Sequence, residues 1–348
     1  MKRLYAIQYL RAVAALGVVV FHAAERTGTH FAIGAAGVDI FFVISGFIMW
    51  VLAGTRTTTP AAFLRERIER IVPLYWIVTG VMILGALFGL FPNLQLTPGY
   101  VLSSLFFIPS RSPGTGDIWP VLVQGWTLNY EMFFYLLFAA SLFLRSRWRL
   151  PALTMLFLAL VATGLLTDPQ MSAPRIWTDP LLLEFLLGMA LGEIWLRGVI
   201  PPPAWGGALA AFAVAGFAFV GITYRGFMPF VLGPLAAALV LGVLAFEKKE
   251  KVACVPLAAY FGDASYSIYL WHTLAISVVA KAGPMLALPP FLTFVAAVLC
   301  GTAIGVAVHE TLEKPIAAFM KARRQRLKAP APSSPPRSAP GACGTARP

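Results

Sequence analysis

The chain has 348 residues, of which 59% are hydrophobic and only 12% charged, and its mean hydropathy is +0.77. Apolar stretches long enough to cross a bilayer recur from end to end, which excludes a soluble globular protein. The net charge of +12 is compatible with nucleic-acid binding. However, the basic residues are distributed by membrane side, so we expect membrane lipids and no nucleic acid as partners.

The apolar stretches predict an all-α fold, a polytopic membrane helical bundle with about ten transmembrane helices. The expected spans are approximately 5–24, 34–54, 71–91, 119–144, 150–166, 179–197, 203–222, 227–246, 262–281 and 290–312. The stretch 100–117 is too short to cross and is broken by Pro109 and Pro113. We therefore expect it to be an interfacial or re-entrant segment.

The distribution of Lys and Arg predicts the orientation of the bundle. Ten crossings place both termini on one side, and the loops on that side hold most of the basic residues, including a cluster from Lys314 to Lys328. Positive-inside bias therefore predicts that both termini are cytoplasmic. We expect a transmembrane domain over 1–320 and a disordered, basic and Pro-rich cytoplasmic tail over 321–348.

The first expected span carries two ionisable residues, Arg11 and His22. Eleven steps of about 100° return almost to the starting azimuth, so a helix places both on one face, about 16 Å apart along its axis. Ionisable groups within spans usually face a bundle interior or a wet cavity, which makes the pair a candidate functional site. Gln8 and Arg11 interrupt the apolar run, which argues against a cleaved signal peptide.

The second span opens with the run GVDIFFVISGF, which puts Asp39 near the depth of His22. A carboxylate within hydrogen-bond reach would raise the basicity of the imidazole and fix its tautomer, as a general base requires. The alternative is an aspartate that caps the exposed N–H groups at the start of a helix.

The stretch FLRERIERIVPLYW places Arg65, Arg67 and Arg70 around the cytoplasmic membrane surface. Arginine forks suit phosphate oxygens, and a phosphorylated cofactor from the cytosol would meet these side chains first. Arg70 is the preferred candidate because it adjoins the span. Orientation of the helix by charge and contact with anionic lipids are the alternatives.

Two further spans carry polar residues. Glu131 lies well inside the segment GWTLNYEMFFY, where it pairs with a cation such as Arg11, donates as a neutral acid, or links helices by a hydrogen bond. In SYSIYLWH, the residues Ser265, Tyr269 and His272 are spaced by four and three, so they line one helix face that must point into the bundle.

The last span ends in His309, Glu310 and Glu313 near the cytoplasm, where Glu313 is placed to pair with Arg70 or with a neighbour. The three cysteines and four histidines of the chain have no metal-ligand spacing. We therefore predict no metal site.

Taken in order, these motifs resemble the integral-membrane acyltransferase 3 family. The motifs are Arg11 and His22 with ten residues between them, GVDIFFVISGF, the stretch from Arg70, WTLNYEMFFY, SYSIYLWH and HETLEKP. The resemblance covers Tyr5 to Pro315 and is greatest to bacterial exopolysaccharide O-acetyltransferases. It implies a multi-pass protein of the bacterial inner membrane that moves an acyl group from cytosolic acyl-CoA, such as acetyl-CoA, to a glycan or lipid-linked sugar.

The resemblance implies a catalytic role for His22 and an essential one for Arg11. We extend catalytic roles to Asp39, Glu131 and His272. His22 is expected to act as general base on a sugar hydroxyl that attacks the thioester, and the alternative is a nucleophile that carries the acyl group itself. For the cofactor we expect binding by Arg65, Arg67, Arg70, Ser265 and Tyr269.

Two other functions remain open at the level of sequence. The buried charges suit a proton relay in a transporter that exports a small solute, although no inverted repeat is visible. A structural scaffold would leave the costly charges without a purpose. The acyl group, the acceptor glycan and the oligomeric state are not determined by the sequence.

Overall fold

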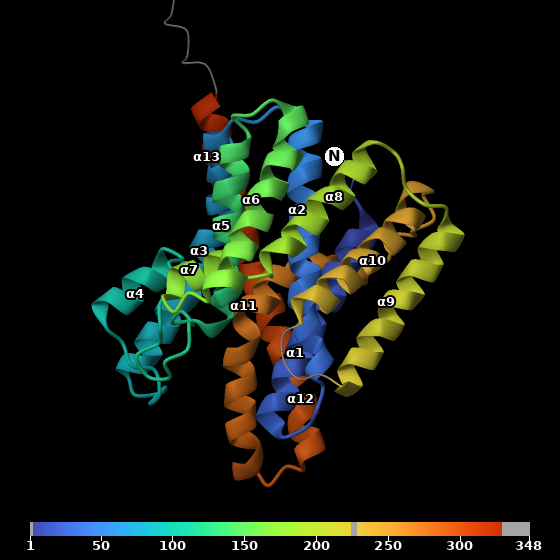
Figure 1. Ribbon diagram of the computed structural model, residues 1–348. Helices are drawn as coiled ribbons and strands as arrows, with labels where there is room; N and C mark the ends of the chain where they lie inside the picture. Colours follow the sequence, from blue (N-terminus) through green and yellow to red (C-terminus); the bar gives the residue numbers. More distant parts are fainter. Residues whose placement is uncertain (1–2, 224–227, 329–348) are drawn as a thin grey trace, which may run out of the picture.

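The computed structural model describes residues 3–223 and 228–328, and within these ranges every regular element is a helix. The predicted all-α fold is therefore confirmed, and Figure 1 shows the helices gathered into one bundle. The α-helices are α1 (Tyr5–Thr27), α2 (Gly37–Thr55), α3 (Pro60–Leu87), α4 (Pro98–Leu105), α5 (Trp126–Ser141), α6 (Ser146–Thr167), α7 (Ser172–Trp177), α8 (Leu182–Leu196), α9 (Pro203–Thr223), α10 (Pro229–Lys248), α11 (Pro256–Met285), α12 (Pro290–Val308) and α13 (Lys314–Lys328). Shorter 3-10 helices, η1 (Ala32–Ala36) and η2 (Val123–Gly125), precede α2 and α5, and a π-helix, η3 (His309–Glu313), joins α12 to α13.

In the described part of the chain, seven helical stretches are long and apolar enough to cross a membrane. They are Tyr5–Thr27, Ala32–Thr55, Pro60–Leu87, Ser146–Thr167, Pro203–Ile222, Pro229–Lys248 and Pro290–Gln325. The protein is thus a polytopic membrane bundle. The other three predicted crossings correspond to α5 and α8, which have 16 and 15 residues, and to the more polar α11.

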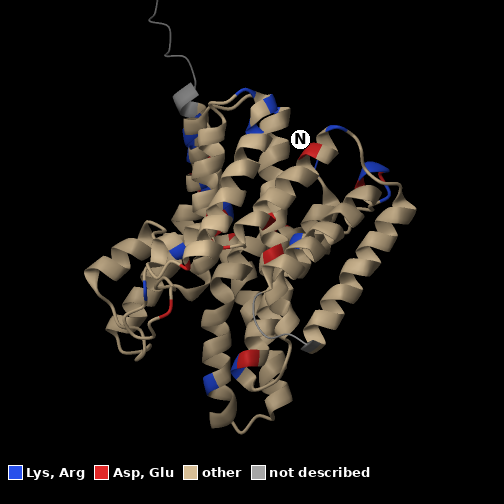
Figure 2. Cartoon of the chain, viewed as in Figure 1, with Lys and Arg blue, Asp and Glu red and all other residues tan. Residues whose placement is uncertain are grey.

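The basic residues gather at one end of the bundle. Figure 2 shows Lys and Arg on the α5–α6 and α8–α9 connections and on α13, at the same end as the start of α1. The turn between α11 and α12 lies at the opposite end (Figure 1). Both ends of the described chain therefore lie on the basic side, and we call this the basic end below.

Several predicted boundaries differ from the structure. Helix α3 begins at Pro60, where the Thr59 hydroxyl accepts a hydrogen bond from Ala62 N at 3.2 Å, so the three arginines lie inside a helix. The stretch 100–117 forms the end of α4 and an irregular segment. Helix α13 extends to Lys328, so residues 321–328 of the predicted tail are helical, because a basic amphipathic sequence continues past the predicted boundary. Residues 329–348 lie outside the described part.

Small residues allow the helices that carry polar groups to approach closely. A Cβ on Gly262 of α11 would lie 2.2 Å from the Gln8 carbonyl oxygen of α1. A Cβ on Gly188 of α8 would lie 2.0 Å from the Val43 oxygen of α2. Glycine at such positions is typical of membrane helix pairs, which gain stability mainly from close packing. These approaches fix the α1–α11 and α2–α8 pairs.

Candidate active site

Helices α1 and α11 run in the same direction and place their polar residues opposite one another. The guanidinium of Arg11 donates to Ser265 Oγ at 2.9 Å and to Gln8 Oε1 at 3.3 Å. Further along both helices, the ring of His22 lies against the ring of His272, with centroids 5.3 Å apart. The predicted polar faces of the two helices are therefore real and face each other.

The hydrogen bonds of the two histidines indicate which ring nitrogens are available. His22 Nδ1 lies 3.1 Å from Glu25 Oε2, one turn further along α1. His272 is fully buried, and its Nδ1 donates to the Ile268 carbonyl oxygen at 3.0 Å. With Nδ1 protonated, Nε2 of each ring carries the lone pair. No hydrogen-bond partner of His272 Nε2 lies among the described residues.

A cavity opens beside the Arg11–Ser265 contact, and it measures about 770 Å³ including the space open to solvent. Its lining includes five of the predicted site residues, namely Arg11, Arg70, Glu131, Ser265 and Tyr269. Aliphatic and aromatic side chains of α2, α3, α5 and α11 form most of the remaining wall, together with the hydroxyl groups of Ser45, Thr127, Tyr135 and Tyr266. An apolar cavity with a few convergent polar groups is the usual form of a small-molecule site.

Glu131 is held by neighbouring hydroxyl groups. It accepts hydrogen bonds from Ser45 Oγ at 3.0 Å and from the Tyr135 hydroxyl. The Ser45 bond joins α2 to α5, so Glu131 does link helices, and it also faces the cavity that Arg11 lines. A direct ion pair between Arg11 and Glu131 is not among the described contacts.

The three arginines of α3 have different surroundings. Arg70 lines both this cavity and a second one between α3 and α13, which measures about 520 Å³ including the space open to solvent. Arg67 is buried and lines neither cavity. Its guanidinium carbon lies 5.9 Å from the Phe63 ring centroid, and its Nη2 lies 3.7 Å from Glu66. Arg65 is exposed and lines neither cavity. Of the three arginines, Arg70 alone therefore lines a cavity.

Asp39 does not lie beside His22 as expected. It is fully buried on α2, and its carboxyl group lies against that of Glu184 on α8. The reason is the orientation of α2, whose first turn presents Asp39 to α8, whereas the carboxylate at His22 is that of Glu25. Asp39 lines neither cavity, so the expected interaction with the imidazole is absent.

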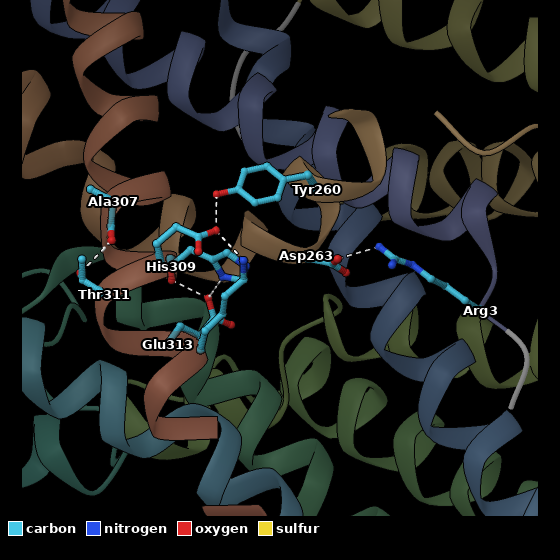
Figure 3. A network of polar contacts seen from close by, with 10 residues as sticks. Arg3, Tyr260, Asp263, Ala307, His309, Thr311 and Glu313 are labelled. Atoms are coloured by element: carbon cyan, nitrogen blue, oxygen red, sulfur yellow. Dashed lines mark hydrogen bonds and ion pairs between the residues drawn. The ribbon is translucent and has the colours of Figure 1, made fainter. Parts of the chain in front are cut away.

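At the basic end, polar side chains gather around the π-helix η3. Figure 3 shows His309 Nδ1 beside Glu313, at 2.7 Å, and the Tyr260 hydroxyl, which donates to Glu310 at 2.6 Å. Glu313 also accepts from Ser267 Oγ at 2.5 Å and lines the second cavity with Arg70. The predicted partner of Glu313 is thus a neighbour, His309. A π-turn inside a long helix is frequent at functional sites.

Sequence reasoning missed two contacts. Glu25 lies three residues after His22, a spacing that faces the same side of a helix and could have identified it. The Asp39–Glu184 contact joins residues far apart in sequence and depends on the packing of α2 against α8. Among the described residues, no three His, Cys, Asp or Glu side chains are grouped to hold a metal ion.

Comparison with known proteins supplies the class of chemistry. A family model described as an acyltransferase domain matches residues 4–310. The exopolysaccharide production protein ExoZ of Rhizobium meliloti is 56% identical over 306 residues, which are 88% of this chain and 96% of that protein.

More distant relatives carry the names of acyl-transferring enzymes. The peptidoglycan O-acetyltransferase OatA of Listeria monocytogenes is 25% identical over 76% of this chain and 48% of its own length. The putative membrane-bound transacylase BcsY of Komagataeibacter xylinus is 28% identical over 78% of this chain and 72% of its own. No solved structure matches. An enzyme that transfers acyl groups is thereby favoured over a transporter or a scaffold.

Proposed function

The chain belongs to the acyltransferase 3 family, and on this premise we propose that it is an O-acyltransferase of the bacterial inner membrane. The proposed donor is cytosolic acyl-CoA, with acetyl-CoA first. The proposed acceptor is a hydroxyl group of an extracytoplasmic or lipid-linked glycan. Relatives named for exopolysaccharide production and for peptidoglycan O-acetylation support a carbohydrate acceptor.

The observation that carries the proposal is that one cavity joins Arg70 to the Arg11–Ser265 contact. Arg70 is exposed, and no described hydrogen bond or ion pair occupies its guanidinium. We propose that it binds a phosphate of CoA, for which the planar guanidinium is well suited. The mainly apolar wall beyond it suits a pantetheine arm.

Arg11 is proposed to bind the donor away from the reacting carbon. Eleven residues at about 1.5 Å each put its backbone roughly 16 Å from that of His22 along α1. Its guanidinium contacts Gln8 and Ser265 and faces the cavity. A polar group of the pantetheine arm is therefore a more suitable partner than the carbonyl that reacts near His22. Glu131, on the opposite wall, is proposed to orient the same arm through the hydroxyl groups it binds.

His22 is proposed as the general base. Glu25 holds Nδ1–H, which leaves Nε2 to accept the proton of the acceptor hydroxyl. The resulting alkoxide forms a C–O bond to the thioester carbonyl carbon, and the C–S bond breaks. The imidazolium then returns its proton to the CoA thiolate, so the products are an ester and free CoA. His272 is proposed as a positioning residue, because its fixed ring lies against that of His22.

Purified full-length protein in nanodiscs with radiolabelled acetyl-CoA and an exopolysaccharide acceptor tests this function. The proposal predicts label in the glycan together with an equal amount of free CoA. Transport of a solute with the thioester left intact would contradict it and support the transporter. Protein boiled before the reaction is the blank for non-enzymatic transfer.

A further inference from the structure

The cavity that Arg11 and Arg70 line, called the donor cavity below, does not reach the pair of His22 and His272, and Tyr269 contacts both the cavity and the pair. Its phenol ring lines the cavity, and its centroid lies 6.2 Å from that of His272. Neither His22 nor His272 lines the cavity. We infer that the Tyr269 side chain closes the inner end of the donor cavity and limits the length of the acyl chain, an inference that rests on the proposed function.

The direction of α11 identifies which end Tyr269 closes. Helix α11 starts at the basic end, so Tyr269 lies one turn further from that end than Ser265 and three residues before His272. Arg70, by contrast, is shared with the second cavity beside α13. A donor that enters past Arg70 therefore brings its acyl group to Tyr269 before it reaches either imidazole.

Hydrogen bonds and packing hold the Tyr269 side chain in this position. Its hydroxyl lies 2.9 Å from Thr127 Oγ1 and donates to the Gln124 carbonyl oxygen at 3.2 Å. Its ring meets that of Phe41 nearly edge-on, with centroids 6.0 Å apart. A buried phenol hydroxyl that loses its partners is unfavourable, so the ring resists displacement.

This arrangement favours short acyl groups. With an acetyl group, only a brief, small rotation of Tyr269 is needed to bring the thioester carbonyl to the acceptor. A longer chain must hold the ring away from Thr127 and Gln124. Removing the ring would open apolar space. Each methylene group of the acyl chain that enters this space should raise kcat/KM, relative to that of acetyl-CoA, by roughly fourfold to tenfold.

The test compares acetyl-CoA, butyryl-CoA and hexanoyl-CoA as donors for wild type, Tyr269→Ala and Tyr269→Leu. The measured quantity is kcat/KM for transfer to the glycan. We expect both substitutions to raise the ratio of hexanoyl to acetyl transfer by about tenfold or more. Tyr269→Leu keeps an apolar side chain and keeps the test valid if the alanine variant does not fold, which size-exclusion chromatography determines.

Tyr266→Ala is the matched control. Tyr266 lines the same cavity, but its hydroxyl donates to the Ile71 carbonyl oxygen at 2.8 Å on the side of α3. Its removal should lower transfer from all three donors and leave the ratio of hexanoyl to acetyl transfer within about twofold of wild type. A twofold change is smaller than the roughly fourfold effect of burying one methylene group. Folded Tyr269 variants with the wild-type ratio of hexanoyl to acetyl transfer would overturn this inference and leave the proposed function unaffected. A wild-type protein that cleaves none of the thioesters would overturn the proposed function itself.

Discussion

The rings of His22 and His272 lie 5.3 Å apart, inclined by 33°, although 249 positions in the sequence separate them. The contact exists because Gly262 lets α11 approach α1 closely near Gln8, and both helices then run in the same direction. It places the partly exposed imidazole of His22 beside the fully buried imidazole of His272. In the proposed reaction, the acceptor hydroxyl loses its proton to His22 at this contact.

Glu25 should support His22 without being essential. Its side chain is 55% exposed, so the pair with His22 is screened by water. Replacing it with Gln should lower kcat by about twofold to fivefold, the effect of an ion pair of up to about 1 kcal/mol. Steady-state transfer kinetics measure this. A loss as large as that in His22→Ala would show that Glu25 takes part in the reaction directly.

The bond between Arg11 and Ser265 should contribute to stability. Ser265→Ala removes a hydrogen bond across the α1–α11 contact, and such bonds contribute about 1 kcal/mol in membrane proteins. Thermal unfolding followed by size-exclusion chromatography in detergent should show a lower midpoint. Thr302→Val is the control, because the Thr302 hydroxyl bonds only to Val298 of its own helix among the described contacts. An equal shift in both variants would contradict the assignment.

Arg70 and Arg65 should differ in their effect on the donor. Arg70→Ala should raise the KM for acyl-CoA by about tenfold, the low end of the effect of a hydrogen bond to a charged group. Arg65→Ala should leave the KM near the wild-type value, because Arg65 lines neither cavity. Steady-state kinetics with varied acetyl-CoA measure both KM values, and titration with a non-hydrolysable acyl-CoA thioether gives the matching dissociation constants. Equal effects of the two substitutions would indicate a diffuse surface charge rather than a phosphate contact.

Close packing of α2 on α8 gives a prediction that is independent of function. A Cβ on Gly188 would meet the Val43 carbonyl oxygen at 2.0 Å, so Gly188→Ala should destabilise the protein by about 1–3 kcal/mol. At Gly80 of α3, no atom other than those of its chain neighbours and its own helix backbone lies within 4 Å of the equivalent position. Gly80→Ala should therefore be neutral or stabilise the protein by up to about 1 kcal/mol. If the two variants unfolded at the same midpoint, the close contact between α2 and α8 at Gly188 would be ruled out.

Much of the fold was predictable because lipid imposes simple rules on sequence. Long apolar stretches predicted the helical bundle, and the spacing of Arg11 from His22 and of Ser265 from His272 predicted two polar helix faces that the structure brings together. The resemblance to the acyltransferase 3 family, drawn from motifs in order, is confirmed by the match over 4–310.

Contacts between helices distant in sequence were not predictable in the same way. Asp39 was expected at His22, but helix orientation directs it to Glu184. The periodicity of a helix gives the face on which a residue lies, and not the neighbour that the face meets. The separation of the donor cavity from the histidine pair likewise depends on the side-chain position of Tyr269, which no pattern encodes.

The most direct measurement of the central claim is acyl transfer by His22→Ala beside His30→Ala. His30 is an exposed histidine in the connection after α1 and serves as the matched control. With both variants folded and radiolabelled acetyl-CoA as donor, His22→Ala should lower transfer by roughly 10²- to 10⁴-fold, the usual contribution of a general base. His30→Ala should transfer at the wild-type rate. Full transfer by a folded His22→Ala protein would contradict the account.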